Sequence, residues 1–273
     1  MDNFILQPTT GGLWLGSFPA LTAMGVEHGF STRFGGCGGR DGQTLDLGWK
    51  TGKRESVIED RRRFFEAMNI TPEQVVTICQ VHGTRAVQVD SSALGRSALA
   101  PESSIGEADA LFTNEKQVGM LLGFADCVPV LLFDPIHRAL AVVHAGWRGT
   151  VDLIAQKTLL MMQSAFGSEP ERCFAAIGPS IGPCCYEVDA PVIEAVKRIF
   201  PKPTSQLLFP GNDSDHAKLD LWQANSEQLL AIGVKEKHIF TSHVCTAHHH
   251  QVFHSHRAES GAAGRMGLLA WLK

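Results

Sequence analysis

The chain has 273 residues, of which 44% are hydrophobic, and it carries a formal net charge of −4. This size and composition suffice for a substantial hydrophobic core. The near balance of acidic and basic residues provides no electrostatic surface for a nucleic acid or a membrane, so we expect neither partner. Because the N-terminal residues lack the basic and apolar regions of a signal peptide, we expect a cytoplasmic protein, and a monomer.

Seven cysteines are spread along the chain. An odd number without a signal peptide favours reduced thiols over a disulfide framework. Cys184 and Cys185 are adjacent, and we expect two packed thiols there rather than a bridge between them.

Apolar periodicity and turn residues predict secondary structure in chain order. They predict a helix over 56–68, opened by a capping box, and then strands over 75–79, 87–89, 107–113 and 119–124, a hairpin of 130–133 with 139–143, a helix over 149–166 ended by Gly167, a strand over 174–177, helices over 190–199 and 221–232, a strand over 251–255 and a closing apolar stretch over 266–272. Strands and helices do not alternate strictly. We therefore expect an α+β fold with mixed sheets and flanking helices, in one domain over 1–273.

The hairpin is the most informative segment, because it brings a cysteine and a histidine together. A two-residue loop at Pro135-Ile136 places Cys127 opposite His144. Directly opposed residues have Cβ atoms roughly 4.5–5.5 Å apart. A thiolate and an imidazole at that separation can share a metal ion, or act as nucleophile and base.

His82 also ends an apolar segment beside a glycine. Two histidines and one cysteine form a three-ligand zinc set that leaves a fourth position for water or substrate. The alternative for any one histidine is an ordinary core residue. A second histidine-rich segment, His248–His250, is expected to be a solvated loop that binds metal only adventitiously.

Four further residues are candidates for substrate binding. Arg148 begins a predicted helix and could hold phosphate, or Trp147 beside it could stack on a base. Arg61 lies on or beside the buried stripe of its helix, where it needs an acidic partner or a bound anion unless it reaches solvent. Arg33 is a further candidate for phosphate, and Asp126 could orient a ligand histidine or cap a turn.

Several motifs in order resemble the YfiH-type polyphenol oxidase (laccase) domain family. They are 30–33 (FSTR), 45–48 (LDLG), 80–83 (QVHG), 108–111 (ADAL), 125–129 (ADCVP), 144–149 (HAGWRG), 177–182 (IGPSIG) and 264–266 (GRM). The resemblance implies a fold related to cytotoxin-like cysteine hydrolases and a zinc ion held by His82, Cys127 and His144. It also implies purine nucleoside phosphorylase activity on adenosine, inosine or methylthioadenosine, with adenosine deaminase activity and a described role in peptidoglycan editing.

The chain departs from this family at a few positions. Asp46 and Asp60 stand where the family often has asparagine, and the segment 253–258 (FHSHRA) lacks the usual aromatic-rich pattern. These positions bear on substrate preference. Three other functions stay open. They are a copper-dependent phenol oxidase, a metal-free hydrolase with Cys127 as nucleophile and His144 as base, and a non-catalytic partner in cell-wall synthesis whose site only binds a ligand.

Overall fold

Two six-stranded mixed sheets form the centre of the molecule in this computed structural model, which describes residues 4–39, 42–200 and 206–273. The first sheet has the order β1 (Ile5–Pro8), β2 (Trp14–Ser17), β3 (Val26–Ser31), β15 (Met266–Leu272), β7 (Gly119–Phe124) and β4 (Val75–Val76). The second has the order β14 (Ile239–Thr241), β10 (Phe174–Ile177), β8 (Val128–Asp134), β9 (Ala139–Ala145), β6 (Ala110–Thr113) and β5 (Ala86–Gln88). Each sheet contains parallel and antiparallel pairs, which confirms the predicted α+β class with mixed sheets.

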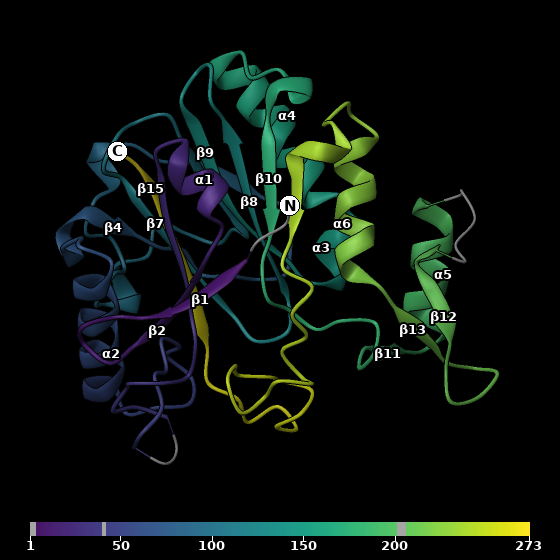
Figure 1. Ribbon diagram of the computed structural model, residues 1–273, viewed down its shortest axis with the longest axis horizontal. Coiled ribbons are helices and arrows are strands. Elements are labelled where there is room, and N and C mark those ends of the chain that lie inside the picture. Colours follow the sequence, from purple (N-terminus) through teal and green to yellow (C-terminus); the bar gives the residue numbers. More distant parts are fainter. Residues whose placement is uncertain (1–3, 40–41, 201–205) are drawn as a thin grey trace.

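The two sheets pack face to face, and helices cover their outer faces (Figure 1). The helices are α1 (Pro19–Ala23), α2 (Arg54–Ala67), α3 (Trp147–Val151), α4 (Ile154–Phe166), α5 (Ala190–Ile199) and α6 (Leu221–Leu230). Successive side chains of β8 point to opposite faces of its sheet, and both faces are buried. Leu131 and Phe133 enter the core between the sheets, whereas Val130 and Leu132 pack in the core beneath α4 and α6.

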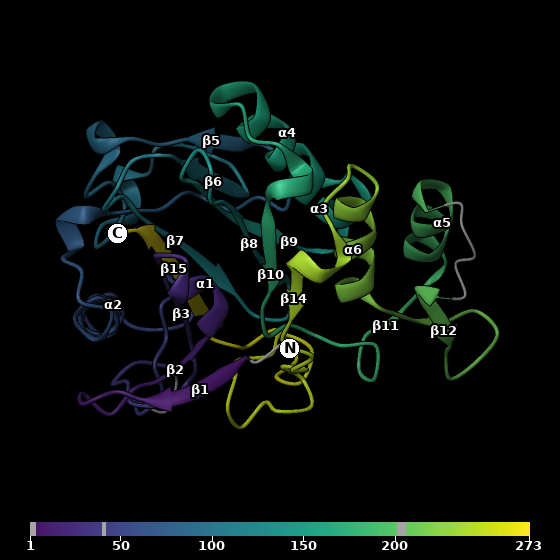
Figure 2. The same ribbon diagram turned by 45° about the horizontal axis from the view of Figure 1, so that its top comes forward.

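The first sheet has its own helix-covered core on the opposite side. Phe64 and Phe65 of α2 pack with Leu121 of β7 and Leu269 of β15. Figure 2 views α2 nearly end-on, with both sheets between it and the α4–α6 side. The four layers leave the ends of the strands, rather than their faces, free to carry a site.

A small third sheet projects beyond α6 (Figure 1). It consists of β11 (Glu187–Val188), β13 (Ala217–Leu219) and β12 (Leu208–Pro210), all antiparallel, with α5 beside it. No described helix combines the length and the apolar run that crossing a bilayer requires.

The β8–β9 hairpin exists, but its predicted register is wrong. Asp134 pairs with Ala139 and Pro129 pairs with His144, so the loop has four residues rather than two. The Asp134 carboxylate explains the longer loop, because it accepts hydrogen bonds from the amides of Ile136 and His137 at 2.8 and 3.2 Å. The observed register differs from the predicted one by two residues. Because side chains alternate with a period of two, each side chain still lies on the predicted face of the sheet.

Other predictions were wrong in detail. The helix expected over 149–166 is two helices, α3 and α4, separated at Leu153, which has a φ of 61°. The segment 251–255 forms turns rather than a strand. The strands expected over 75–79 and 107–113 are shorter, whereas those over 119–124 and 174–177 and the helix over 190–199 have the predicted bounds. The closing apolar stretch over 266–272, for which no element type was predicted, forms strand β15.

Candidate metal centre

His82, Cys127 and His144 come together at one end of the two sheets. His82 lies in the loop after β4, Cys127 precedes β8, and His144 lies near the end of β9. Their ligand atoms all lie within 4.8 Å of one another. The imidazole rings of the two histidines meet edge to face with centroids 4.9 Å apart. The structure thus gathers the three residues that the sequence analysis selected.

A buried carboxylate organises this cluster. Asp109, which precedes β6, is fully buried, and its oxygens accept hydrogen bonds from the amides of Val81, His82 and Gly83 at 3.3, 3.0 and 2.6 Å. The same carboxylate lies 2.8 Å from Nδ1 of His144. An Nδ1–H that donates to Asp109 leaves Nε2 as the free ligand nitrogen, the usual arrangement of a metal-bound histidine.

Space at the cluster depends on a glycine. A Cβ atom added at Gly146 would lie 3.0 Å from Sγ of Cys127 and 3.2 Å from Cδ2 of His82. Contacts that short would require the Cys127 and His82 side chains to shift by a few tenths of an ångström. The glycine in the segment 144–149 thus gives two of the three ligand side chains the room that they occupy.

The cluster also has the electrostatic character of a metal-ligand set. Burial alone would raise the pKa of the Cys127 thiol, but His144 and His82 outweigh burial and lower it to about 6. Burial alone would lower the pKa of His144, but the Cys127 sulfur and the Asp109 carboxylate raise it to about 9. Without a metal, Cys127 and His144 are therefore a thiolate and an imidazolium at neutral pH. Zinc binds a thiolate and neutral imidazoles, so zinc binding would release the proton of His144. The donor set, its supporting carboxylate and the space beside Gly146 therefore fit a metal ion.

A cavity of about 330 Å³ opens beside the two histidines. Its lining includes His82, His144 and three cationic side chains, Lys50, Arg61 and Arg265, together with the indole of Trp49. Among the described residues, the lining contains no carboxylate. The cavity is thus a positively charged chamber that adjoins a cluster of metal-ligating groups.

Arg61 is buried on this wall, as one of the predicted alternatives requires, but its partners are carbonyls. It donates to the carbonyl oxygens of Leu47, Ser97 and Ala98 at 2.8–3.1 Å, and its guanidinium lies 4.3 Å from the ring centre of Trp49. Burial lowers the pKa of Arg61 to about 9. Carbonyls satisfy the hydrogen bonds of Arg61, and the Asp46 carboxylate, which acts on it through its charge, favours the protonated guanidinium. Arg61 therefore stays a cation at the cavity wall, with part of its field offset by Asp46.

The other candidates lie elsewhere. Arg148 is exposed, stacks over Trp147 at 4.3 Å, and does not line the cavity. Its helix α3 has only five residues. Arg33 lines a separate cavity of about 90 Å³ and lies 3.5 Å from the carboxylate of Glu259.

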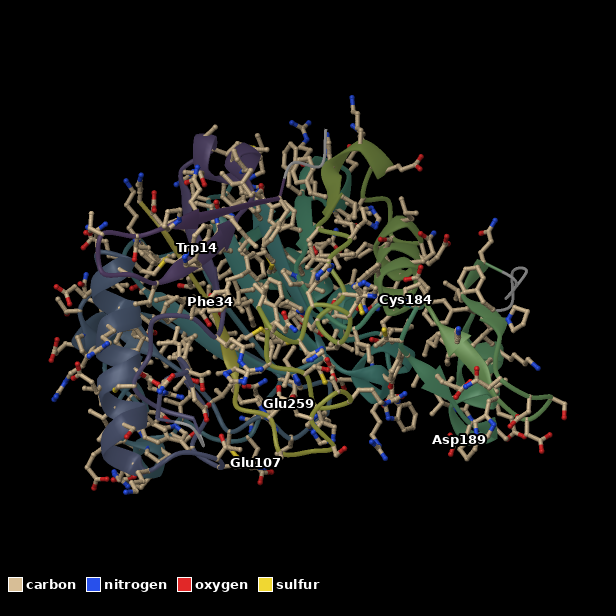
Figure 3. All side chains as sticks on the ribbon, turned by 60° about the horizontal axis from the view of Figure 1, so that its bottom comes forward. Trp14, Phe34, Glu107, Cys184, Asp189 and Glu259 are labelled. Carbon is tan, nitrogen blue, oxygen red and sulfur yellow. The ribbon has the colours of Figure 1, made fainter. Side chains whose placement is uncertain are left out.

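Glu259 itself is strongly acidic. The side chain of His254 and the cation of Arg33, with the amide of Ser255, outweigh burial and lower the pKa of Glu259 to about 2. Figure 3 shows Glu259 on the segment that precedes β15. Arg33 is thus paired within the protein, which distinguishes it from the cations of the larger cavity.

Asp126 does not orient a ligand histidine. Its carboxylate accepts hydrogen bonds from Oγ1 of Thr246 at 2.6 Å and from the amide of Arg257 at 2.7 Å. Its φ of 79° places it in a tight turn, in line with the alternative of a turn residue. The orienting carboxylate is Asp109, which the sequence analysis quoted only as part of a motif.

Comparison with known proteins places this chain in one family. The chain belongs to the family described as multi-copper polyphenol oxidoreductase laccase, whose model matches residues 27–273. A relative from Geobacillus stearothermophilus named purine nucleoside phosphorylase YlmD is 36% identical over 97% of this chain and 96% of its own length. The Escherichia coli purine nucleoside phosphorylase YfiH is 32% identical over 91% of this chain and 94% of its own.

Solved structures agree with this assignment. The crystal structure of YlmD from Geobacillus stearothermophilus matches with a TM-score of 0.92 and 34% identity, over 99% of this chain and all of that one (100%). The recognised resemblance to the YfiH-type laccase domain family is therefore confirmed. The relation to cysteine hydrolases stays a prediction.

Proposed function

We propose that this protein is a purine nucleoside phosphorylase that holds zinc with His82, Cys127 and His144. The observation that carries the proposal is the continuity of the cationic cavity with the histidines of the ligand cluster. One chamber can thus hold an anion beside the position where the nucleoside would react. The names of the curated relatives support the same substrate class.

Phosphate is the anion that this chamber suits. Lys50, Arg61 and Arg265 line it without a carboxylate among the described lining residues. One terminal nitrogen of Arg265 donates to the carbonyls of Ala263 and Gly264 at 2.6 and 2.9 Å, which fixes the guanidinium. A fixed guanidinium recognises phosphate with directed, charge-assisted hydrogen bonds. We therefore assign phosphate binding to the cavity cations and not to Arg148 or Arg33.

The reaction follows from this placement. A phosphate oxygen forms a bond to the anomeric carbon of the ribose while the bond from that carbon to the purine nitrogen breaks. The bonding electron pair leaves with the purine, which takes up a proton, and the products are the base and ribose 1-phosphate. The cations hold the phosphate in place, which converts an encounter of two solutes into an oriented reaction, and Trp49 offers a flat apolar surface for the base.

The metal contributes Lewis acidity when bound, because a three-ligand zinc site leaves one position for water or a substrate group. Asp109 fixes the ring of His144, and Gly146 keeps the space between Cys127 and His82. Adenosine deamination, in which water replaces the amino group and ammonia leaves, is the second activity that we propose for this centre. It ranks second because nucleobase deaminases use a glutamate as general acid and base, and the described cavity lining has none.

A copper oxidase is the alternative suggested by the family description. One cysteine with two histidines also suits a blue-copper site. A multicopper enzyme needs further histidine clusters, however, and in the described part of the chain the other group of metal-ligating residues within 4.8 Å contains three cysteines and no histidine. An intense visible absorption of the copper-loaded protein, with oxidation of phenols, would favour the oxidase.

A metal-free hydrolase is the remaining alternative, because the thiolate of Cys127 beside His144 is also a nucleophile–base pair. Alkylation of Cys127 would abolish the activity of such an enzyme, and chelation of metal would not. The peptidoglycan editing role that the family resemblance implies would then rest on hydrolysis.

Product analysis tests the proposed function. The purified protein is incubated with adenosine and phosphate, and the products are separated by chromatography. We expect adenine and ribose 1-phosphate from the wild type, and neither from Cys127→Ala. Cys37→Ser is the matched control, since Cys37 lies outside both the cavity lining and the ligand cluster. Unchanged turnover in Cys127→Ala would refute the assigned site.

A further inference from the structure

A second group of thiols lies outside the proposed active site. Cys184 and Cys185 belong to the loop between β10 and β11, and Cys245 follows β14. Their sulfur atoms all lie within 4.8 Å of one another, although the three cysteines are free. We call these three residues the thiol cluster. Figure 3 shows Cys184 where the chain passes from the main body toward the small sheet.

Backbone hydrogen bonds hold the two segments of the thiol cluster in register. The amide of Ser180 donates to the carbonyl of Val244 at 3.2 Å, and the amide of Thr246 donates to the carbonyl of Ser180 at 3.1 Å. The thiols are therefore brought together by paired backbone and not by flexible side chains alone. Such preorganisation is what a metal site requires of its ligands.

The spacing of the sulfur atoms fits a thiolate-bound metal ion. Sγ of Cys184 lies 3.6 Å from Sγ of Cys185. Zinc–sulfur bonds of about 2.3 Å in a regular tetrahedron place two sulfurs about 3.8 Å apart. A disulfide, in contrast, needs a sulfur–sulfur separation of about 2.0 Å. The observed separation thus matches metal coordination without rearrangement of the loop.

Cys245 is buried and its sulfur faces two backbone N–H groups. Only 5% of its surface is exposed, and its sulfur accepts hydrogen bonds from the amides of Gly182 and His248 at 3.2 and 3.4 Å. Two N–H donors stabilise a negative sulfur, as they do around metal-bound thiolates. Cys184 is exposed, so the cluster opens to solvent on that side and leaves an entry path for an ion.

We propose that Cys184, Cys185 and Cys245 bind one thiophilic d¹⁰ cation, such as Zn²⁺ or Cu⁺, through three thiolates with a fourth position open to solvent. Soft thiolate sites select these ions. This second site shares no ligand with the centre formed by His82, Cys127 and His144. It therefore stands whether or not the protein acts on nucleosides.

Occupancy of the thiol cluster would tie the loop before β11 to the segment after β14. Thr246, next to Cys245, donates its hydroxyl to the carboxylate of Asp126 at 2.6 Å, and Asp126 precedes Cys127. The cation would thus brace the turn that carries the cysteine of the first centre. We expect the metal-loaded site to stabilise the folded state by mass action, since the unfolded chain does not hold the three thiols together.

Cadmium is the probe of choice, because its bonds to thiolates give an ultraviolet charge-transfer absorption that histidine-bound metal does not give. The experiment uses the full chain with Cys127→Ala, which removes the thiol of the first centre. Titration with Cd²⁺ under anaerobic conditions should give an absorption that rises to one equivalent. Adding Cys184→Ser and Cys185→Ser should abolish this absorption. Adding Cys37→Ser and Cys79→Ser instead, outside the cluster, should leave it unchanged.

Three outcomes would overturn the proposal. They are no cadmium–thiolate absorption in the Cys127→Ala chain, an absorption that survives loss of Cys184 and Cys185, or a mass showing that two of the three cysteines form a disulfide in protein purified anaerobically. Circular dichroism of the metal-free variants checks that they fold. If the double substitution unfolds the chain, Cys184→Ser alone, at an exposed position, should remove the one-equivalent endpoint, and an unchanged endpoint would refute the site.

Discussion

Replacing Asp109 by asparagine tests how the first metal centre is built. The carboxylate accepts hydrogen bonds on both oxygens, from the amides of Val81, His82 and Gly83 and from Nδ1 of His144. An asparagine keeps one oxygen and presents an NH₂ group in place of the other. If the NH₂ group replaces Oδ2, the amides of Val81 and Gly83 lose their acceptor. If it replaces Oδ1, the amide of His82 and Nδ1 of His144 lose theirs.

Two charge-assisted hydrogen bonds, at least one of them only partly buried, are lost in either orientation. At about 1.5–3 kcal/mol each, the free energy of unfolding should fall by about 3–6 kcal/mol, with the lower value if water reaches the freed amides. Zinc affinity should fall by about 10- to 100-fold, the usual effect of removing a carboxylate behind a metal-bound histidine. Urea denaturation of the metal-free protein measures the first effect, and competition with a chelator of known zinc affinity measures the second.

Asp134→Asn is the matched control. Asp134 is also fully buried, lies 2.8 Å from Nδ1 of a histidine, His137, and accepts hydrogen bonds from two loop amides. It lies at the end of β8 remote from Cys127. We expect Asp134→Asn to lower stability and to leave zinc affinity unchanged. Equal zinc affinity in Asp109→Asn and the wild type would refute the role assigned to Asp109.

Three further predictions follow from the geometry. Gly146→Ala should weaken zinc binding by the first centre, measured in a chain that also lacks the thiol cluster, because the added Cβ would crowd Cys127 and His82. Gly11→Ala, whose Cβ would meet only Thr9 Oγ1 at an ordinary contact of 3.9 Å, should leave zinc binding unchanged. Unchanged binding by Gly146→Ala would contradict the crowding argument. Arg265→Ala should raise the KM for phosphate by about tenfold or more, consistent with loss of a charge-assisted contact of at least about 1.4 kcal/mol, and the exposed Arg172→Ala should leave it unchanged. The pKa of Glu259 is lowered to about 2, so its ionised carboxylate should stabilise the fold at neutral pH, and this stability should be lost as the pH falls from about 4.5 to 2. The urea midpoint of Glu259→Gln should therefore fall less over this pH range than that of the wild type. The same pH dependence in both proteins would refute the stabilising role of Glu259.

The sequence predicted those elements whose apolar pattern is unbroken. The strand Met266–Leu272 and the β8–β9 hairpin are buried along their whole length, so local hydrophobicity is sufficient to identify them. The edge strand β1 and its neighbour β2 were missed because they are short and partly exposed. The hairpin register was wrong because a side chain, the Asp134 carboxylate, sets the length of the loop.

The three ligands of the first centre could be selected because each ends an apolar segment beside a small residue. Asp109 was missed as their organiser because its four hydrogen-bond partners come from two distant segments. The cavity residues Trp49, Lys50 and Arg265 lie in loops, where no periodicity indicates which way a side chain points. Tertiary contacts alone reveal these residues, and the thiol cluster likewise joins segments far apart in the chain.

The most direct test of the proposed function is zinc-dependent turnover of adenosine in phosphate buffer. Metal is removed by chelation and zinc is then returned in measured amounts, while adenine and ribose 1-phosphate are quantified. Our account predicts that phosphorolysis is lost when the metal is removed and recovers as zinc occupies the site formed by His82, Cys127 and His144. Full turnover by the metal-free protein, or no turnover of any purine nucleoside after zinc is restored, would contradict it.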